Sequence, residues 1–148
     1  MPQAPILTGQ DIAEAQGAVT RLLERALEPT GVSRHAYVVL RVLVVRGPRP
    51  PRELHAFLAD QPQLGLSADA VAALLAGLEE SGHATGTALD SPGPAQATPE
   101  GAALLARLNE AATPAISALY GGFAPEDLAV AHRVLVEVTE RADELAAK

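Results

Sequence analysis

The chain has 148 residues, and its 18 Asp and Glu against 11 Lys and Arg give a formal net charge of −7 at pH 7. It has no Cys, which excludes a disulfide framework, a thiolate nucleophile and a Cys-type zinc site. No apolar run approaches the roughly 20 residues that a membrane span needs, and the N-terminus lacks a signal-peptide pattern. The composition therefore predicts a soluble, cytoplasmic protein with no general affinity for nucleic acid.

The apolar residues of the chain recur at helical spacing, and about 30 of its residues are Ala, which favours helices. Both features predict a mainly helical fold. A capping pattern at Thr8 opens the first expected helix, and Pro29 with Gly31 ends it. A second helix is expected from about Ser33 to the turn at residues 46–48. Its apolar stripe is expected at Tyr37, Leu40, Leu43 and Val44.

A short third helix is expected at Glu53 to Asp60, since Pro50 and Pro51 fit only a first turn or the preceding linker. Residues 61–65 are expected to form a linker. Ser67 then caps a helix with the strongest periodic signal in the chain, and Gly82 closes it.

Residues 83–97 contain glycine and proline breaks and few β-branched residues, so a hairpin there is only weakly encoded. Thr98 followed by Pro99 predicts the start of a long helix, which Gly121 and Gly122 end. A last helix is expected from Pro125, with acidic residues in its first turn.

Several segments, in this order and spacing, resemble the MarR family of bacterial transcriptional regulators. Residues 32–43 (VSRHAYVVLRVL) resemble the second-helix segment of that family, and residues 53–58 (ELHAFL) resemble its Glu-Leu-Ala-x-x-Leu helix. Residues 66–82 are similar to its recognition helix with the Leu-Glu-x-x-Gly that follows, and residues 98–101 (TPEG) match the opening of its post-wing helix.

The resemblance implies a mainly α fold, a winged helix-turn-helix with N- and C-terminal helices that form a dimerisation collar. The whole chain, 1–148, is then a single domain. Residues 1–31 and 99–148 would be dimerisation helices, and 32–98 the winged helix-turn-helix, with its wing at about 83–97. Members of the family are homodimers that bind palindromic operators and release them when a small phenolic or anionic ligand binds.

The resemblance also places the ligand pocket beside the second helix, where Arg34, His35, Tyr37 and Arg41 become its candidate residues. The arginines and the histidine could donate to an anionic or phenolic ligand, while surface charge and helix pairing is the simpler role. Tyr37 stands where the family often has Phe, which favours a role in the core.

The family positions that face DNA lack basic residues in this chain. The candidate contacts at the recognition helix are Ser67, Asp69, Ala70 and Ala73, and the two wing arginines of the family are absent. Between Glu53 and Ala106 there is no Lys or Arg against seven acidic residues. Because phosphate contacts supply most DNA affinity, this composition predicts weakened operator binding.

Three arginines favour some DNA contact, since Arg46, Arg49 and Arg52 surround the start of the third helix, where backbone phosphate can bind. An ordinary solvated turn is the alternative for them. The distance from Leu54 to Ser67 is about six residues longer than the corresponding distance in the family. The extra residues, near 59–64, lengthen the turn of the helix-turn-helix.

Three functions are compatible with this pattern. The leading hypothesis is a MarR-like homodimer that keeps its small-molecule pocket and has weakened or lost operator binding. The second is a conventional ligand-responsive repressor that reads DNA through shape and water. The third is a pocket recruited for catalysis on a small metabolite, with His35, Tyr37 or His132 in acid–base roles. No reaction motif or metal-ligand spacing occurs, so no cofactor or metal is expected.

Overall fold

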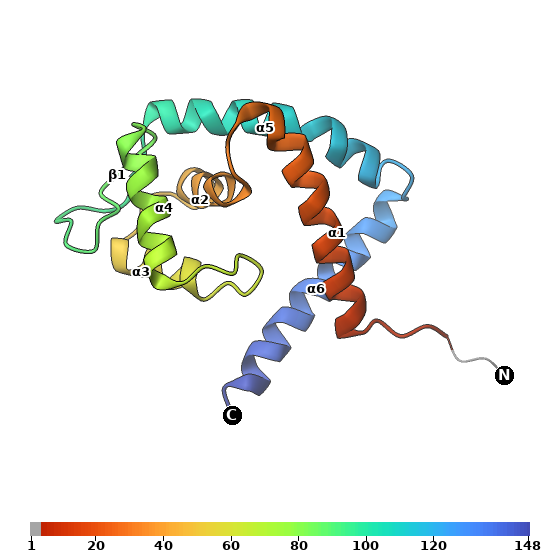
Figure 1. Ribbon diagram of the computed structural model, residues 1–148. Helices are drawn as coiled ribbons and strands as arrows, with labels where there is room; N and C mark the ends of the chain where they lie inside the picture. The colour runs from red at the N-terminus through yellow and green to blue at the C-terminus, as the bar shows by residue number, and fades with distance from the viewer. Residues whose placement is uncertain (1–3) are drawn as a thin grey trace. The chain divides into compact units, whose positions relative to one another are not determined.

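A computed structural model describes residues 4–148 of the chain (Figure 1), so the first three residues of the expected N-terminal dimerisation segment lie outside the described part. Its backbone forms two compact units, one extending to Ala115 and the other comprising Ile116–Lys148. The elements, in chain order, are α1 (Gly9–Leu27), the 3-10 turn η1 (Glu28–Thr30), α2 (Arg34–Val45), α3 (Pro51–Ala59), α4 (Ala68–Glu80), β1 (Ala84–Thr85), β2 (Gln96–Ala97), α5 (Pro99–Tyr120) and α6 (Pro125–Ala146). This is the expected order of a winged helix-turn-helix with flanking helices.

Side-chain caps fix the starts of four helices; at the start of α5, the Gly101 amide donates to Thr98 Oγ1 over 3.0 Å. Thr8 forms a capping box with Asp11, in which the Asp11 amide donates to Thr8 Oγ1 over 3.1 Å and the Thr8 amide donates to Asp11 Oδ2 over 2.9 Å. Ser33 and Ser67 accept from the amides three residues later, each over 3.1 Å. These caps confirm the predicted starts of α1, α2 and α4.

The third helix begins at Pro51, two residues before the predicted Glu53. A proline ring is compatible with the first helical position because the amide at that position has no partner inside the helix. The chain therefore enters α3 through Pro50 without a side-chain cap.

Two core clusters meet along α2, which explains why its buried face is broader than the predicted stripe. The first cluster joins α2, α3, α4 and the hairpin, and includes Val39, Leu43, Leu54 and Leu75. The second joins the end of α1, α2 and the first half of α5. Its members are Leu27, Tyr37, Leu40, Leu104, Leu105 and Leu108. The prediction that Val44 belongs to the buried stripe is wrong, since its side chain is 39% exposed.

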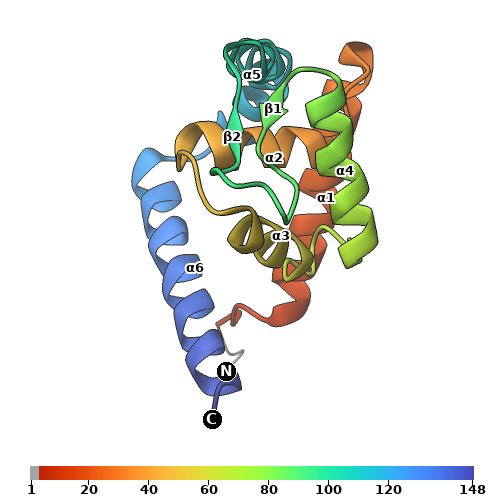
Figure 2. The ribbon, with the colours of Figure 1, turned by 90° about the vertical axis from the view of Figure 1, so that its left-hand side faces the viewer.

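The hairpin is short and is held by close backbone packing. Strands β1 and β2 pair antiparallel, with Ala84 opposite Ala97, and lie side by side next to the start of α5 (Figure 2). Gly86 has a φ of +70°, and a Cβ at this position would overlap the carbonyl of Pro94. A Cβ at Gly101 would overlap the carbonyl of His83, so only glycine lets α5 begin this close to the hairpin.

Candidate functional site

Tyr37 is a core residue that links α2 to α5. Its side chain is 4% exposed and belongs to the second core cluster. Its hydroxyl donates a hydrogen bond of 2.6 Å to Oδ1 of Asn109, which satisfies the one polar atom of an otherwise apolar contact. The arrangement agrees with the core role favoured from the sequence.

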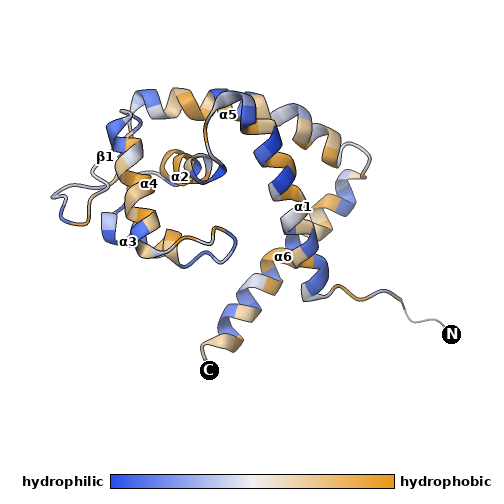
Figure 3. Ribbon diagram, in the orientation of Figure 1, coloured by the Kyte–Doolittle hydropathy of each residue, from blue (hydrophilic) through white to orange (hydrophobic). Residues whose placement is uncertain are grey.

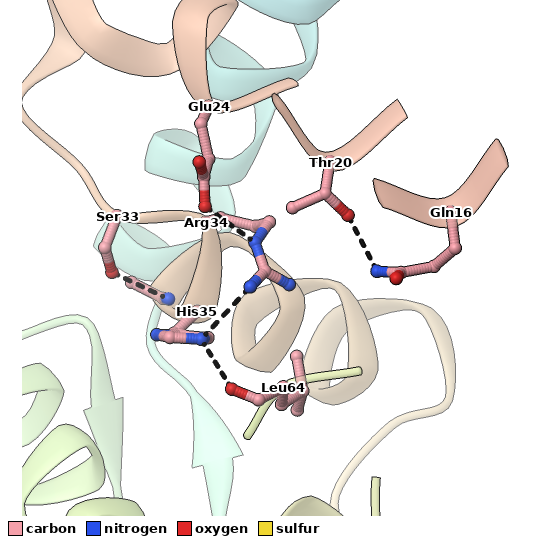
Figure 4. A network of polar contacts seen from close by, with 8 residues as sticks. Gln16, Thr20, Glu24, Ser33, Arg34, His35 and Leu64 are labelled. Carbon is pink, nitrogen blue, oxygen red and sulfur yellow. Dashed lines mark hydrogen bonds and ion pairs between the residues drawn. The ribbon is translucent and has the colours of Figure 1, made fainter. Parts of the chain in front are cut away.

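Arg34 and His35 connect α1 and α2 to the turn between α3 and α4 (Figure 4). Nε of Arg34 lies 3.2 Å from Oε1 of Glu24 in α1, and Nε2 of His35 lies 3.0 Å from the carbonyl oxygen of Leu64. Since a carbonyl only accepts, we assign the proton to Nε2 of His35. Both side chains thus have partners inside the fold.

A cleft lies on a third face of α2, against α3 and the turn between α3 and α4. Its volume is about 360 Å³, and both apolar and polar side chains line it. The lining residues are Val38, Arg41, Val42, Val45, Arg46, Phe57, Gln61, Gln63 and Leu64. Of the four ligand-pocket candidates named from the sequence, only Arg41 lines this cleft.

Two guanidinium groups border the cleft without a carboxylate partner. The Cζ of Arg41 is 5.7 Å from the centroid of the Tyr37 ring, and the Cζ of Arg46 is 5.3 Å from that of Phe57, both within cation–π range. Within residues 4–148, neither arginine forms an ion pair, and no acidic residue lines the cleft. The N–H groups of both arginines are therefore available to an anion.

Phe57, Gln61 and Gln63 were not identified as cleft residues from the sequence, where Arg46 was a candidate for DNA contact only. One signal was present, since Val38, Arg41, Val42 and Val45 repeat at helical spacing beside the predicted stripe, although Val42 also belongs to the first core cluster. The turn residues had no such signal, because their positions depend on long-range contacts.

The outward face of α4 is small and acidic. Ser67 caps the helix, Ala70 is half-buried, and Asp69 and Ala73 are exposed. The remaining exposed positions of the helix also lack a positive charge: Ala68, Ala72, Ala76, Gly77 and Glu80. This surface has neither the cations that bind phosphate nor the long donors that read base edges.

The beginning of the wing is fastened to α3 and α4 through Thr87, a residue that no sequence pattern indicated. Thr87 is 2% exposed, and its amide donates to Oε1 of Glu79 over 2.6 Å. Nε2 of His55 donates to the carbonyl oxygen of Thr87 over 2.7 Å. A carboxylate and an imidazole thus satisfy both main-chain groups of this buried residue.

The three arginines near the start of α3 differ in their surroundings. Arg46 lies against Phe57, and Arg52 is exposed. Arg49 pairs with Ala95 through its main chain, with N–O distances of 3.1 and 2.8 Å. Its Nε is buried and has no hydrogen-bond partner among residues 4–148. These positions could contact an anion at the uncapped start of α3.

The residues considered for catalysis, His35, Tyr37 and His132, do not line the cleft. His35 and Tyr37 are hydrogen bonded as described, and His132 is exposed on α6, in the other unit. Over residues 4–148, no group of three or more His, Asp or Glu side chains is arranged to hold a metal ion. In the same part of the chain, no helix is both long enough and apolar enough to cross a membrane.

Comparisons with known proteins identify the fold. No protein-family model matches the chain, and no curated protein matches it in sequence. Among solved structures, wild-type MarR from Escherichia coli in its apo form is similar over 91% of this chain and 98% of its own, with 18% identity and a TM-score of 0.65.

Two further solved structures are similar to the chain. The MarR family protein Rv2887 of Mycobacterium tuberculosis, in complex with DNA, has 23% identity and a TM-score of 0.65, over 92% of this chain and 98% of its own. NadR in complex with 4-hydroxyphenylacetate has 18% identity and a TM-score of 0.74, over 90% of this chain and 96% of its own. Rv2887 has also been solved in complex with salicylic acid. The chain therefore has the winged helix-turn-helix fold of the MarR family.

Proposed function

We propose that this protein is a homodimer of the MarR type that binds a small aromatic anion in the α2 cleft and binds operator DNA weakly or not at all. The observation that carries the proposal is the pair of guanidinium groups without a carboxylate partner, Arg41 and Arg46, beside a cleft that is lined by valine and phenylalanine side chains as well as polar ones and by no acidic residue. Such a site favours a ligand that joins a carboxylate to an apolar ring. The carboxylate can form hydrogen bonds with the guanidinium groups, and the ring can pack against the apolar side chains of the cleft.

The size of the cleft supports a ligand with one aromatic ring. A volume of about 360 Å³ lies at the lower end of the range for small-molecule sites. Phe57 and the valines of α2 supply apolar contacts for the ring. The proteins of similar fold solved with salicylic acid and 4-hydroxyphenylacetate indicate that aromatic acids are suitable first probes.

Calorimetric titration with phenylacetate tests the ligand site. We expect saturable binding that weakens about tenfold in Arg41→Gln and in Arg46→Gln, because each change removes a charge-assisted hydrogen bond. Phenylacetamide, which lacks the charge, should bind the unchanged protein about tenfold more weakly than phenylacetate.

Arg107→Gln is the matched control, since Arg107 is an exposed arginine of α5 that does not line the cleft. Its affinity for phenylacetate should equal that of the unchanged protein. An absence of saturable binding, or equal affinity in all three variants, would refute the proposed ligand site.

The homodimer is supported by the apolar surface of α6. None of the residues of this helix is buried, although apolar positions recur along it (Figure 3). Five of its large apolar side chains are at least 38% exposed: Val130, Leu135, Val136, Val138 and Leu145. An amphipathic helix with an open apolar stripe favours burial against another surface, and the resemblance to the MarR family implies that this surface belongs to a second copy of the chain.

Sedimentation velocity tests the homodimer. We expect a species of twice the 15.3 kDa chain mass at micromolar concentration, and a shift to the monomer in Leu135→Glu, because a charge would be buried in the interface. Glu140→Gln, an exposed polar position of the same helix, should leave the dimer intact. A monomeric unchanged protein would rule out the dimer.

A conventional ligand-responsive repressor is the second candidate. The observation that favours it is the position of Arg49 and of the exposed Arg52 at the uncapped start of α3, with Arg46 in the turn that precedes them. The similarity to Rv2887, solved with DNA, is compatible with it. Measured DNA affinity and its salt dependence distinguish the two candidates.

A further inference from the structure

The lengthened turn between α3 and α4, residues 60–67, forms one wall of the α2 cleft. Three of its residues, Gln61, Gln63 and Leu64, line the cleft. Within the turn, the Leu64 amide donates to the Gln61 carbonyl over 3.0 Å, and Gly65 has a φ of +63°, which glycine adopts without strain. The extra residues therefore form a defined loop at the ligand site.

Two long-range contacts hold this turn against α2. The Leu64 side chain is 6% exposed and belongs to the first core cluster, and Nε2 of His35 donates to the Leu64 carbonyl (Figure 4). Leu66 also packs against that cluster. The side chain and the carbonyl of Leu64 both hold the turn against α2. The backbone that carries Gln61 and Gln63 is therefore held in place beside the cleft.

The two glutamines form a hydrogen-bonded pair. Nε2 of Gln63 donates to Oε1 of Gln61 over 2.9 Å. The pair then has both Nε2 hydrogens of Gln61 free to donate, and Oε1 of Gln63 free to accept. A neutral group that both donates and accepts, such as a hydroxyl or a carboxamide, matches this combination better than a second carboxylate or a bare ring edge does.

The charged and neutral polar groups of the cleft come from different elements. Arg41 and Arg46 belong to α2 and its C-terminal cap, whereas Gln61 and Gln63 belong to the turn. A ligand that used both would need a carboxylate for the arginines and a separate neutral polar group for the glutamines. We infer that Gln61 and Gln63 determine specificity, and select aromatic acids that also have a hydroxyl or a carboxamide on the ring. This inference rests on the proposed ligand site.

Calorimetric titration with three probes, each of which has the same acetate side chain, tests the inference. Phenylacetate lacks a neutral polar group, 4-hydroxyphenylacetate has a hydroxyl on its ring, and 4-carbamoylphenylacetate has a carboxamide on its ring. We expect the unchanged protein to bind both substituted probes about 3- to 10-fold more tightly than phenylacetate, the value of one or two neutral hydrogen bonds.

Gln61→Leu and Gln63→Leu should each lower this preference towards unity, because a leucine side chain forms no hydrogen bond with the hydroxyl or the carboxamide. Gln10→Leu, an exposed glutamine of α1, is the matched control and should keep the preference. Thermal unfolding of each variant confirms that it is folded.

The outcomes separate this inference from the proposed function. Arg41-dependent binding of phenylacetate without any preference among the probes would overturn only the role of the glutamines. Equal weakening of all three probes in the leucine variants would also overturn it, because a merely structural turn behaves in that way. Failure of every probe to bind would overturn the ligand site together with this inference.

Discussion

Replacement of Leu64 by Ala is expected to lower the free energy of unfolding by about 2–4 kcal/mol, although the residue lies in a turn. The physical reason is that its side chain is 6% exposed and packs in the first core cluster with residues of α2, α3 and α4. Truncation would leave a cavity where these three helices meet. Urea denaturation at constant protein concentration measures the effect.

Leu89→Ala is the matched control for this substitution. Leu89 also lies in a loop, but its side chain is 59% exposed, and its truncation should change the free energy of unfolding by less than about 0.5 kcal/mol. If both substitutions have the same small effect, Leu64 does not contribute to the core and the turn is a surface loop.

DNA binding is expected to be weak, unselective and strongly reduced by salt. If Arg46, Arg49 and Arg52 of both protomers contacted phosphate, six contacts would give a slope of log affinity against log salt of roughly −5. Affinity would then fall about a thousandfold between about 50 and about 200 mM salt. Fluorescence anisotropy should give equal affinities for a DNA duplex from the promoter of the protein's own gene and for a duplex of scrambled sequence.

The double substitution Arg49→Gln and Arg52→Gln should bring this slope to about −2, since it leaves one arginine per protomer. Arg46 is left unchanged because it also lines the ligand cleft. The matched control, Arg107→Gln with Arg133→Gln, removes the same charge from exposed positions of α5 and α6. Nanomolar binding to one operator that persists at the higher salt would instead establish the conventional repressor.

Local signals in the sequence predicted most of the helices. The capping residues Thr8, Ser33 and Ser67 form hydrogen bonds with amides three residues away, so their effect depends only on nearby sequence. The winged-helix order followed from the spacing of these segments. The start of α3 was misplaced by two residues, because the preference of proline for the first helical position competed with the linker interpretation.

The site was harder to predict, because its residues are placed by contacts between distant parts of the chain. His35 meets Leu64 across 29 positions, and Tyr37 meets Asn109 across 72. The resemblance grouped four residues of α2 beside one pocket: Arg34, His35, Tyr37 and Arg41. Local spacing could not distinguish the face of α2 towards α1 and α5 from the face towards the turn. For the same reason, Gln61 and Gln63 had no detectable signal in the expected linker.

The attachment of Thr87 has a consequence for how α4 and the wing would contact a DNA duplex. Because His55 of α3 and Glu79 of α4 hold both main-chain groups of Thr87, the base of the wing is joined to the two helices of the helix-turn-helix. A rotation of α4 would carry the base of the wing with it, as one block. Engagement of the helix and of the base of the wing is therefore expected to be gained or lost together.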